Sequence, residues 1–490
     1  MSLRNKALGG VFWTFTQQFS VQIINLLVQI VLARLLMPEA FGVIALLQIF
    51  VSIGQILMDS GMTSSLIRTK DADQRDYSTV FFMNLSISIG VYIFLFALSP
   101  RIAGFFGQPI ITSILRVYAL SFVIQALYSV QVTRLTKQMN FKLQMLMQIP
   151  SSIIGGVVGI SLAFTGFGVW SLVWLNLATT SCLMLQYWIR ISWKPSPIVD
   201  GKLLRKHFNF GYKLALSSLL TEVYRNSYTF IIGKVYSTTQ LGYYNQANTL
   251  KMFPVRNLTT ALQKVTYPLF SQIQDDDIQL KKVFRRITSV VLYVVVPMMF
   301  YLIVVADPLF RLVLTEKWLP AVPYFQVLCI SAVFYPLSLY NLNIISAKGR
   351  SDLHFRLEII KKVLASLFLL LIIPYGIWGI VYAQAISLVI HYIVNAYYSG
   401  KMINYSLSQQ LKDALPVFVI AVLAVIISVC VDRLLVSWVS HLDVLRLIFD
   451  FVVFFFTYIA LSYIVRVKAL KEVKSIFIEI KRKSFKVKKQ

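Results

Sequence analysis

Charged side chains lie within several stretches of the sequence that are otherwise apolar enough to cross a membrane. Among them are Glu222, Arg225, Lys251 and Arg256. An Arg or Lys at the centre of a spanning helix costs roughly 2.5–3.5 kcal/mol, so it persists where it lines water or pairs with another group. Glu222 and Arg225 are three residues apart, a spacing that allows an ion pair along one helix. Such a pair can be purely structural or can face an aqueous cavity, and the sequence leaves both interpretations open.

Uncharged amides form stripes on two further apolar stretches. On a helical wheel, four amides of "WTFTQQFSVQIINLLVQIVLARLLMP" (13–38) share one narrow face. The next stretch repeats the spacing with two glutamines, a serine and a carboxylate. The residues are Gln18, Gln22, Asn25 and Gln29 in the first stretch, and Gln48, Ser52, Gln55 and Asp59 in the second. Interhelical hydrogen bonds, worth about 0.6 kcal/mol each, are one explanation for them. The other is a polar ligand in a cavity.

Apolar blocks of roughly 20 residues must position these side chains, and each is long enough to cross a hydrocarbon core of about 30 Å. The chain has 490 residues, of which 57% are hydrophobic and 14% charged. It is therefore predicted to be an all-α integral membrane protein with about 14 transmembrane helices. The predicted helices cover 10–36, 40–66, 77–98, 110–133, 143–165, 167–190, 208–234, 240–271, 283–306, 321–346, 354–374, 377–399, 413–437 and 445–465.

The distribution of basic residues predicts the topology. The formal net charge of +27 could indicate a nucleic-acid partner, but most of the 47 Lys and Arg residues fall in alternate loops. This is the positive-inside pattern, so both termini are predicted to be cytoplasmic and no nucleic acid is expected. The other set of loops holds few: Arg34, Arg101, Lys234, Arg311, Lys317, Arg433 and Arg446. The basic tail 466–490 is either an amphipathic segment on anionic headgroups, with Val473, Ile476, Phe477 and Ile480 on one face, or a solvated tail.

An internal repeat relates two parts of the chain. "VLARLLMPEAFGVIA" (31–45) aligns without gaps on "IIGKVYSTTQLGYYN" (231–245), which places Gly42 on Gly242. "GVWSLVW" (168–174) matches "GIWGIVY" (376–382) at nearly the same offset. We therefore predict two six-helix lobes in a parallel repeat, with a central aqueous cavity between them. The predicted domains are an N-terminal lobe 1–200, a C-terminal lobe 201–400, two additional helices in 401–465, and the basic cytoplasmic tail 466–490.

The repeat also allows the polar stripes of the two copies to be compared. Shifted by the repeat offset, the amide stripe of the first helix falls on Ser218, Glu222, Arg225 and Thr229. The same face is thus polar in both copies, but it carries charge in the second. This asymmetry predicts a first lobe suited to neutral polar groups and a second suited to charged ones.

The stretches "LARLLMPEAFG" (32–42) and "AKGRSDL" (347–353) resemble polysaccharide-export flippases of the multidrug/oligosaccharidyl-lipid/polysaccharide (MOP) flippase superfamily. The resemblance is greatest to Wzx-type exporters of lipopolysaccharide and colanic acid. It implies a flippase that moves polyprenyl-pyrophosphate-linked oligosaccharide repeat units from the cytoplasmic to the periplasmic leaflet of the bacterial inner membrane. The implied mechanism is alternating access, for the biosynthesis of cell-surface polysaccharide.

That substrate implies a role for each polar residue. A pyrophosphate is expected to bind Arg225, Lys251 and Arg256 through charge-assisted hydrogen bonds. The sugars are expected to contact the cavity amides Gln18, Gln22, Asn25, Gln29, Gln48 and Gln55. The intramembrane carboxylates Asp59 and Glu222 are candidates for binding a coupling H⁺ or Na⁺. Lipid-linked oligosaccharide and membrane lipids are the expected partners, together with polysaccharide polymerase and export machinery.

Other functions remain as alternatives. A cation-coupled drug antiporter of the same superfamily should show an excess of carboxylates, whereas basic residues predominate here. A peptidoglycan lipid-precursor flippase also handles a pyrophosphate headgroup and is harder to exclude. The pair Asp71 and Asp73 imitates a glycosyltransferase D-x-D motif, but the loop around it is too short for a nucleotide-binding domain. No enzymatic activity, metal or cofactor is therefore predicted.

Overall fold

The computed structural model describes residues 3–439 and 443–475, and all regular structure within these residues is helical. The first helices are α1 (Leu3–Leu35), α2 (Pro38–Asp59), α3 (Met62–Arg68), α4 (Gln74–Phe106), α5 (Ile110–Tyr118), α6 (Leu120–Lys137), α7 (Phe141–Phe164), α8 (Trp170–Arg190) and α9 (Gly201–Val235). They are followed by α10 (Thr238–Gln272), α11 (Asp277–Val304), α12 (Ala306–Val313), η1 (Glu316–Ala321), α13 (Val322–Ala332), α14 (Phe334–Ala347), α15 (Ser351–Ile372), η2 (Ile373–Tyr375), α16 (Gly376–Met402), α17 (Leu407–Val439) and α18 (Asp443–Ile464). The all-α prediction is confirmed.

The apolar blocks form membrane-spanning helices. In the described residues, eleven helical segments are long and apolar enough to cross a membrane, and one of them contains both α15 and α16. Helices α9 and α10 are not among the eleven, although each is 35 residues long. Their charged and amide side chains lower their hydropathy, and these include the residues that the sequence singled out. The protein is a multi-pass membrane protein.

Some predicted helices are broken where the backbone changes direction. The predicted helix 40–66 ends at Asp59, because Ser60 and Gly61 both adopt left-handed conformations with φ of 45° and 69°. The prediction of one continuous helix there was wrong. The block 110–133 likewise forms α5 and α6, and the block 321–346 lies within η1, α13 and α14.

Acidic residues begin several helices at the loops predicted to be cytoplasmic. Asp73 accepts hydrogen bonds from the backbone of Arg75 and Asp76 at the start of α4. Asp276 caps α11 through the backbone N–H of Gln279, at 2.9 Å. A carboxylate in this position satisfies backbone donors that the first helical turn leaves open. Asp73, from the D-x-D pair, is therefore a helix cap.

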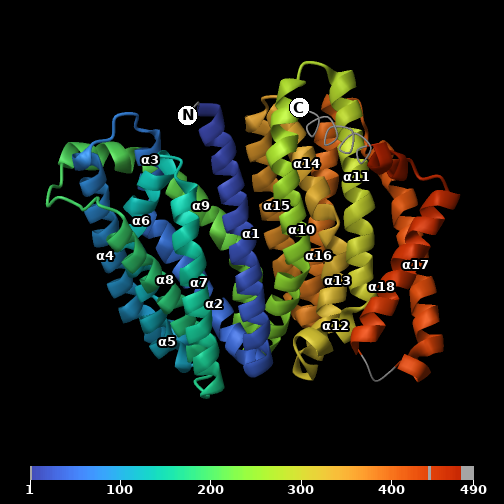
Figure 1. Ribbon diagram of the computed structural model, residues 1–490, viewed down its shortest axis with the longest axis horizontal. Helices are drawn as coiled ribbons and strands as arrows, with labels where there is room; N and C mark the ends of the chain where they lie inside the picture. The colour runs from blue at the N-terminus through green and yellow to red at the C-terminus, as the bar shows by residue number, and fades with distance from the viewer. Residues whose placement is uncertain (1–2, 440–442, 476–490) are drawn as a thin grey trace, which may run out of the picture. The chain divides into compact units, whose positions relative to one another are not determined.

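The chain divides into two compact units, unit 1 (Met1–Gly242) and unit 2 (Tyr243–Gln490). Figure 1 shows that long helices run alongside one another within each unit. In unit 1, α9 packs against α2, α3 and α4, so this unit extends beyond the predicted boundary at residue 200. The predicted domains rest on internal sequence similarity rather than on packing, and they stay a prediction.

Small residues bring helices of unit 1 close together. A Cβ at Gly155 or Gly159 of α7 would clash with Thr179 or Leu175 of α8. A Cβ at Gly156 would lie 2.5 Å from Val28 of α1. Glycines at this spacing allow helix backbones to approach closely inside a membrane. The contact at Gly156 brings α1 close to α7.

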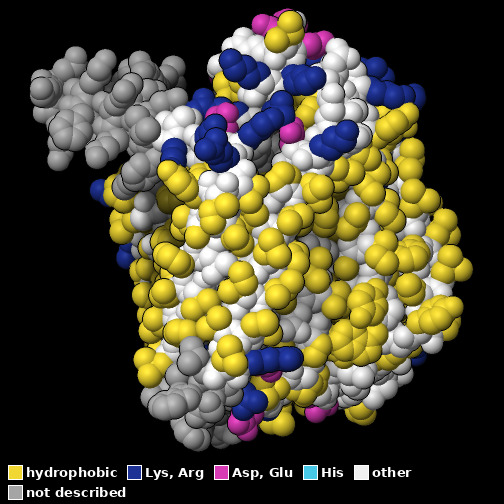
Figure 2. Space-filling view, turned by 90° about the vertical axis from the view of Figure 1, so that its right-hand side faces the viewer, with side chains coloured by type: hydrophobic (Ala, Val, Ile, Leu, Met, Phe, Trp, Pro, Cys, Tyr) yellow, Lys and Arg dark blue, Asp and Glu magenta, His cyan; other side chains and the backbone are white. Residues whose placement is uncertain are grey.

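In unit 2, α16 lies among α13, α14 and α15, while α17 packs on α11 and α18. Its core contains large buried aromatic side chains, among them Trp318, Phe310, Phe325 and Tyr340. Figure 2 shows one face of the molecule on which hydrophobic side chains cover the middle and Lys and Arg gather at one end. This surface pattern is that of a helix bundle whose middle faces lipid.

Candidate functional site

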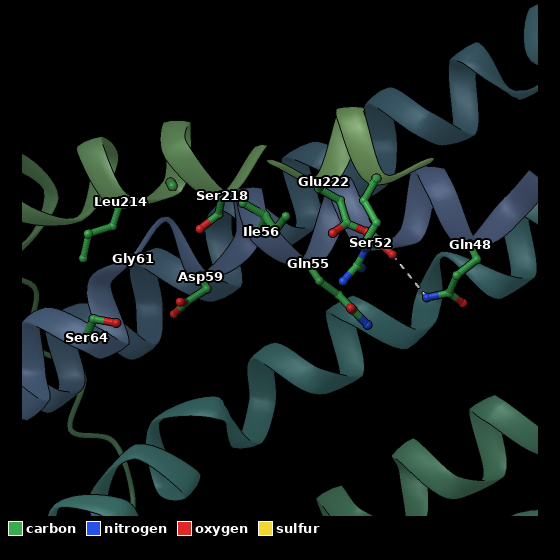
Figure 3. A pocket seen from close by; sticks show the side chains of 12 residues that line it. Gln48, Ser52, Gln55, Ile56, Asp59, Gly61, Ser64, Leu214, Ser218 and Glu222 are labelled. Carbon is green, nitrogen blue, oxygen red and sulfur yellow. Dashed lines mark hydrogen bonds and ion pairs between the residues drawn. The ribbon is translucent and has the colours of Figure 1, made fainter. Parts of the chain in front are cut away.

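A cavity of about 430 Å³ lies inside unit 1, between α2–α3 and α9. Figure 3 shows polar side chains from both sides turned toward it. Its lining residues are Gln48, Ser52, Gln55, Ile56, Asp59, Gly61, Ser64, Leu214, Ala215, Ser218, Glu222 and Arg225. Five of the predicted site residues thus come together: Gln48, Gln55, Asp59, Glu222 and Arg225.

Helix α2 supplies the amide side of the cavity because of its periodicity. Gln48, Ser52, Gln55 and Asp59 recur at helical spacing, so they share a face. The rest of the helix presents an apolar, buried face, with Leu46, Leu47, Val51 and Met58 in the core. Burial of that face holds the polar face toward α9.

Gln48 is held in place by hydrogen bonds that the sequence did not reveal. Its Oε1 accepts from the Tyr118 hydroxyl at 3.0 Å. Its Nε2 donates to the Ser52 hydroxyl at 3.2 Å. Tyr118 lies in α5, so only the fold brings it to this amide. The amide group is therefore oriented before any ligand arrives.

Helix α9 supplies the charged side of the cavity. Arg225 Nη2 lies 2.6 Å from Glu222 Oε1, which confirms the predicted ion pair along one helix. The Asn226 amide donates to the same oxygen at 2.8 Å, a partner that the sequence analysis missed. The Glu222 side chain is 9% exposed, whereas that of Arg225 is 69% exposed. Glu222 thus anchors the Arg225 guanidinium. Most of the five N–H donors of this guanidinium remain available to solvent or a ligand.

One end of the cavity is closed by a contact between backbones. A Cβ built on Gly61 would lie 2.5 Å from the carbonyl oxygen of Gly211, and one on Gly211 would overlap the carbonyl oxygen of Ser60. Only glycine at both positions allows α9 to approach this closely. This is the end that the charge pattern predicts to face the cytoplasm.

A buried hydrogen-bond network stabilises the helix contacts near Gly61 and Gly211. His207 of α9 is fully buried, with Nε2 2.9 Å from Asp76 Oδ1 and Nδ1 2.8 Å from the Ser65 hydroxyl. Lys206 Nζ also lies 3.6 Å from Asp76 Oδ1. The network joins α3, α4 and α9. His207 and Asp76 are 131 residues apart in the sequence, so no local pattern could have predicted the network.

A second glycine contact joins the start of α2 to the start of α10. A Cβ on Gly42 would overlap the Thr238 carbonyl oxygen, and one on Gly242 would overlap that of Pro38. These four residues pair with each other at the repeat offset of 200. Such a reciprocal contact is what a two-fold relation between the two copies produces. The parallel repeat itself stays a prediction.

The remaining predicted residues lie elsewhere. Gln18 and Asn25 of α1 are exposed, and Gln22 and Gln29 are half-buried. They do not line the cavity, because α1 packs on α7 rather than beside α2. In unit 2, Lys251 is 1% exposed and close to Cys329, whereas Arg256 is exposed. The proposed roles of these six residues stay predictions.

Similarity to known proteins extends over most of the chain. The family described as "Polysaccharide biosynthesis protein" matches residues 31–323. The chain belongs to this family. It is 25% identical to the teichuronic acid biosynthesis protein TuaB of Bacillus subtilis (strain 168), over 86% of this chain and 87% of that protein. It is 24% identical to the lipopolysaccharide biosynthesis protein WzxC of Escherichia coli (strain K12), over 74% of each chain.

The fold also matches a solved structure. The inward closed conformation of the lipid II flippase MurJ superposes with a TM-score of 0.72, covering 93% of this chain and 98% of that one at 15% identity. This likeness shows that the chain shares the helical fold of that structure over most of its length. The family match and the two relatives confirm the resemblance that the motifs "LARLLMPEAFG" and "AKGRSDL" indicated.

Proposed function

We propose that this family member is a flippase for polyprenyl-pyrophosphate-linked oligosaccharide units, working by alternating access between the two leaflets of the bacterial inner membrane. The observation that carries the proposal is the composition of the cavity in unit 1. Oriented amides and hydroxyls of α2 face a guanidinium on α9 that Glu222 holds in place. Both termini are proposed to be cytoplasmic, in keeping with the distribution of Lys and Arg.

The cavity suits the two chemical parts of such a substrate. Amides and hydroxyls exchange hydrogen bonds with sugar hydroxyls, and Gln48, Ser52 and Gln55 supply them along one helix face. A guanidinium binds pyrophosphate oxygens through charge-assisted hydrogen bonds, which are stronger where water is excluded. We assign the first pyrophosphate contact to Arg225, because Lys251 is enclosed within unit 2. The polyprenyl chain remains in lipid.

The relatives support a role in polysaccharide biosynthesis. TuaB and WzxC carry that process in their names, and a 26% identical relative over 61% of this chain is the succinoglycan biosynthesis transport protein ExoT of Rhizobium meliloti (strain 1021). A cation antiporter is disfavoured by the cavity, because Arg225 neutralises one of its two carboxylates. Polymerase and export proteins are the proposed recipients of the flipped unit.

Glu222 is the proposed coupling group, with H⁺ or Na⁺ as the ion. Protonation would remove the charge that holds Arg225 and would free the guanidinium to move with the substrate. Glu222→Gln preserves the size of the side chain but cannot take up a proton. If this variant flips substrate at the full rate and with unchanged gradient dependence, Glu222 does not couple transport.

The test of function is reconstitution of the purified protein into liposomes with defined lipid-linked oligosaccharides. Outer-leaflet substrate would be measured by its accessibility to an added glycosidase, with and without imposed H⁺ and Na⁺ gradients. We expect protein-dependent flipping that Arg225→Gln reduces strongly and Arg225→Lys reduces less. No flipping of any lipid-linked oligosaccharide, together with gradient-driven export of cationic dyes, would instead establish an antiporter.

A further inference from the structure

A second cavity, of about 730 Å³, lies in unit 2, away from every residue used above. It is formed by the first turns of α11, the first turns of α17 and the segment that follows α18. Its lining residues are Ile278, Lys281, Lys282, Arg285, Arg286, Ser289, Lys412, Asp413, Pro416, Val465, Arg466, Val467, Lys468, Ala469, Lys471 and Glu472. Eight of these are Lys or Arg and two are acidic.

Both acidic residues are already paired. Arg285 Nε lies 2.6 Å from Asp413 Oδ2, and the Tyr405 hydroxyl donates to that oxygen at 2.6 Å. Arg286 Nε lies 2.9 Å from Glu472 Oε2. The first ion pair joins α17 to α11, and the second joins residues 468–475, which are helical, to α11.

The other cations of the cavity lack a counter-ion within the described residues. Lys281 donates to the backbone carbonyl of Asn404 instead of to a carboxylate. Lys282, Lys412, Arg466, Lys468 and Lys471 form no salt bridge in the described part of the chain. The positive-inside rule accounts for basic residues at this end of the helices but not for their convergence on one concave surface.

A left-handed turn after α18 places Arg466 at the cavity. Arg466 has φ of +54°, in the left-handed region, directly after α18. Its N–H bonds to Tyr463 O at 3.2 Å and that of Val467 to Ser462 O at 3.1 Å, the pattern of a helix C-terminal turn. Glycine is the usual residue there because it has no Cβ. The turn fixes the backbone of Arg466 at the edge of the cavity.

Apolar side chains surround the cations. Val467 and Ala469 are buried and anchor the turn, while Ile278 and Val465 are exposed beside the cavity. Figure 2 shows Lys and Arg side chains gathered at one end of the molecule, next to the hydrophobic surface. A ligand at this boundary meets positive charge on one side and hydrocarbon on the other. Lys and Arg bind phosphate oxygens through charge-assisted hydrogen bonds, and basic clusters next to membrane-spanning helices bind anionic lipid headgroups.

We propose that the cavity at the starts of α11 and α17 and the turn after α18 binds the phosphate headgroup of an inner-leaflet lipid. Lys282, Lys412, Arg466, Lys468 and Lys471 contact the phosphate, and the apolar rim contacts the acyl chains. Arg285 and Arg286 serve a different purpose, since their ion pairs hold the cavity wall together. The site is independent of the transport cavity and does not require the proposed function.

The test uses the full-length protein, purified in a neutral detergent and stripped of lipid. Binding is followed by the rise in melting temperature on titration with dioctanoyl phosphatidylglycerol. Dioctanoyl phosphatidylcholine and inorganic phosphate serve as comparison ligands. We expect saturable stabilisation by the phosphatidylglycerol and a much smaller effect of the other two. Equal stabilisation by inorganic phosphate at the same concentration would overturn the assignment to a lipid.

Two variants test the residues. Lys412→Gln/Lys468→Gln/Lys471→Gln should weaken phosphatidylglycerol binding by about 100-fold, since each cation near a lipid surface contributes about fivefold. The matched control Lys70→Gln/Lys194→Gln/Lys202→Gln removes three exposed cations of unit 1 from loops predicted to face the same side. It should leave binding unchanged. An equal loss in the control would mean that the attraction is diffuse and would overturn the site.

Arg466→Gly separates binding from folding. Glycine fits the left-handed turn, so the melting temperature without lipid should stay the same or rise. Binding of phosphatidylglycerol should still weaken about fivefold. Unchanged binding, or a lower melting temperature without lipid, would mean that Arg466 serves the turn alone, and would contradict its place in the site.

Discussion

Two glycine contacts, one at each end of α2, join helix backbones in the same way but are accompanied by different side-chain hydrogen bonds. Each end uses a pair of glycines, Gly42 with Gly242 at one and Gly61 with Gly211 at the other. At the second end, buried His207 adds hydrogen bonds of 2.9 and 2.8 Å to two other helices. At the first, the side-chain bonds are longer: Thr238 contacts Glu39 and Gln108 at 3.4 Å each.

This difference indicates unequal costs of opening. Separating the end at Gly61 and Gly211 would leave buried polar groups unsatisfied, at about 1–3 kcal/mol for each group. Separating the end at Gly42 and Gly242 mainly gives up close packing. A transporter with alternating access needs both openings, so we expect the end at Gly42 to open more readily in the absence of substrate.

The largest effect is expected from Gly42→Leu. Its side chain would overlap the Thr238 carbonyl, a backbone group that cannot move aside independently, so this end cannot close. Overpacking of this kind typically costs about 1–3 kcal/mol. The rate at which an impermeant maleimide labels Gln48→Cys, in a background without the native cysteines, should rise steeply from the outer side.

The matched control for Gly42→Leu is Gly90→Leu in α4, where a Cβ would meet nothing within 4 Å. It should leave labelling unchanged. Equal labelling of the two variants would contradict the inference that the contact at Gly42 closes this end.

His207→Ala is expected to have the next largest effect, at the opposite end. It removes both bonds and leaves Ser65 and Asp76 buried without that partner, at a cost of about 2–3 kcal/mol. Gln48→Cys should then be labelled faster from the inner side, in inverted vesicles. His207→Gln, which can still hydrogen-bond, should restore part of the protection. Faster labelling from the outer side only would reverse the assignment of the two ends.

Glu222→Gln tests the charged side of the cavity. The glutamine still accepts from Asn226, so the fold should persist, but the ion pair with Arg225 is lost. We expect flipping to become independent of the imposed gradient and about tenfold slower, since a hydrogen-bonded charge pair contributes about 1.5–3 kcal/mol. A flipping assay at several gradients measures both quantities, and Thr221→Ser on the same helix is the control.

Gln55→Ala should have the smallest effect. It removes one side chain that supplies a single neutral hydrogen bond, worth about 0.5–1.5 kcal/mol. The substrate concentration for half-maximal flipping should rise about three- to tenfold, with little change in maximal rate. A complete loss of flipping would show that the amide side of the cavity does more than bind sugar.

Most helices could be predicted because apolar blocks of membrane-spanning length rarely form anything other than transmembrane helices. The polar faces of α1 and α2 were also predictable, but not which of them lines the cavity. Periodicity identifies a face, whereas the neighbour of that face depends on packing, here of Val28 against Gly156. The break at Ser60 was not predictable because a left-handed serine is stabilised by tertiary contacts, in this case with Gly211.

The ion pair of Glu222 and Arg225 was predictable because its residues lie on one helix turn. The network of His207 was not, since its partners are remote in sequence. The repeat offset aligns Gly42 with Gly242, and the structure brings these two glycines into contact. Close glycine contacts without such a relation, as at Gly61, need the three-dimensional structure.

The most direct test of the central claim is protection of the cavity by its substrate. Ser52→Cys, in the background without native cysteines, would be labelled with maleimide in the presence and absence of a lipid-linked oligosaccharide. Gly104→Cys, at an open position of α4, is the control. We predict that the substrate slows labelling at position 52 several-fold and leaves position 104 unchanged, and that Arg225→Gln abolishes the protection. Equal labelling at position 52 with and without substrate would contradict the claim that this cavity carries the oligosaccharide.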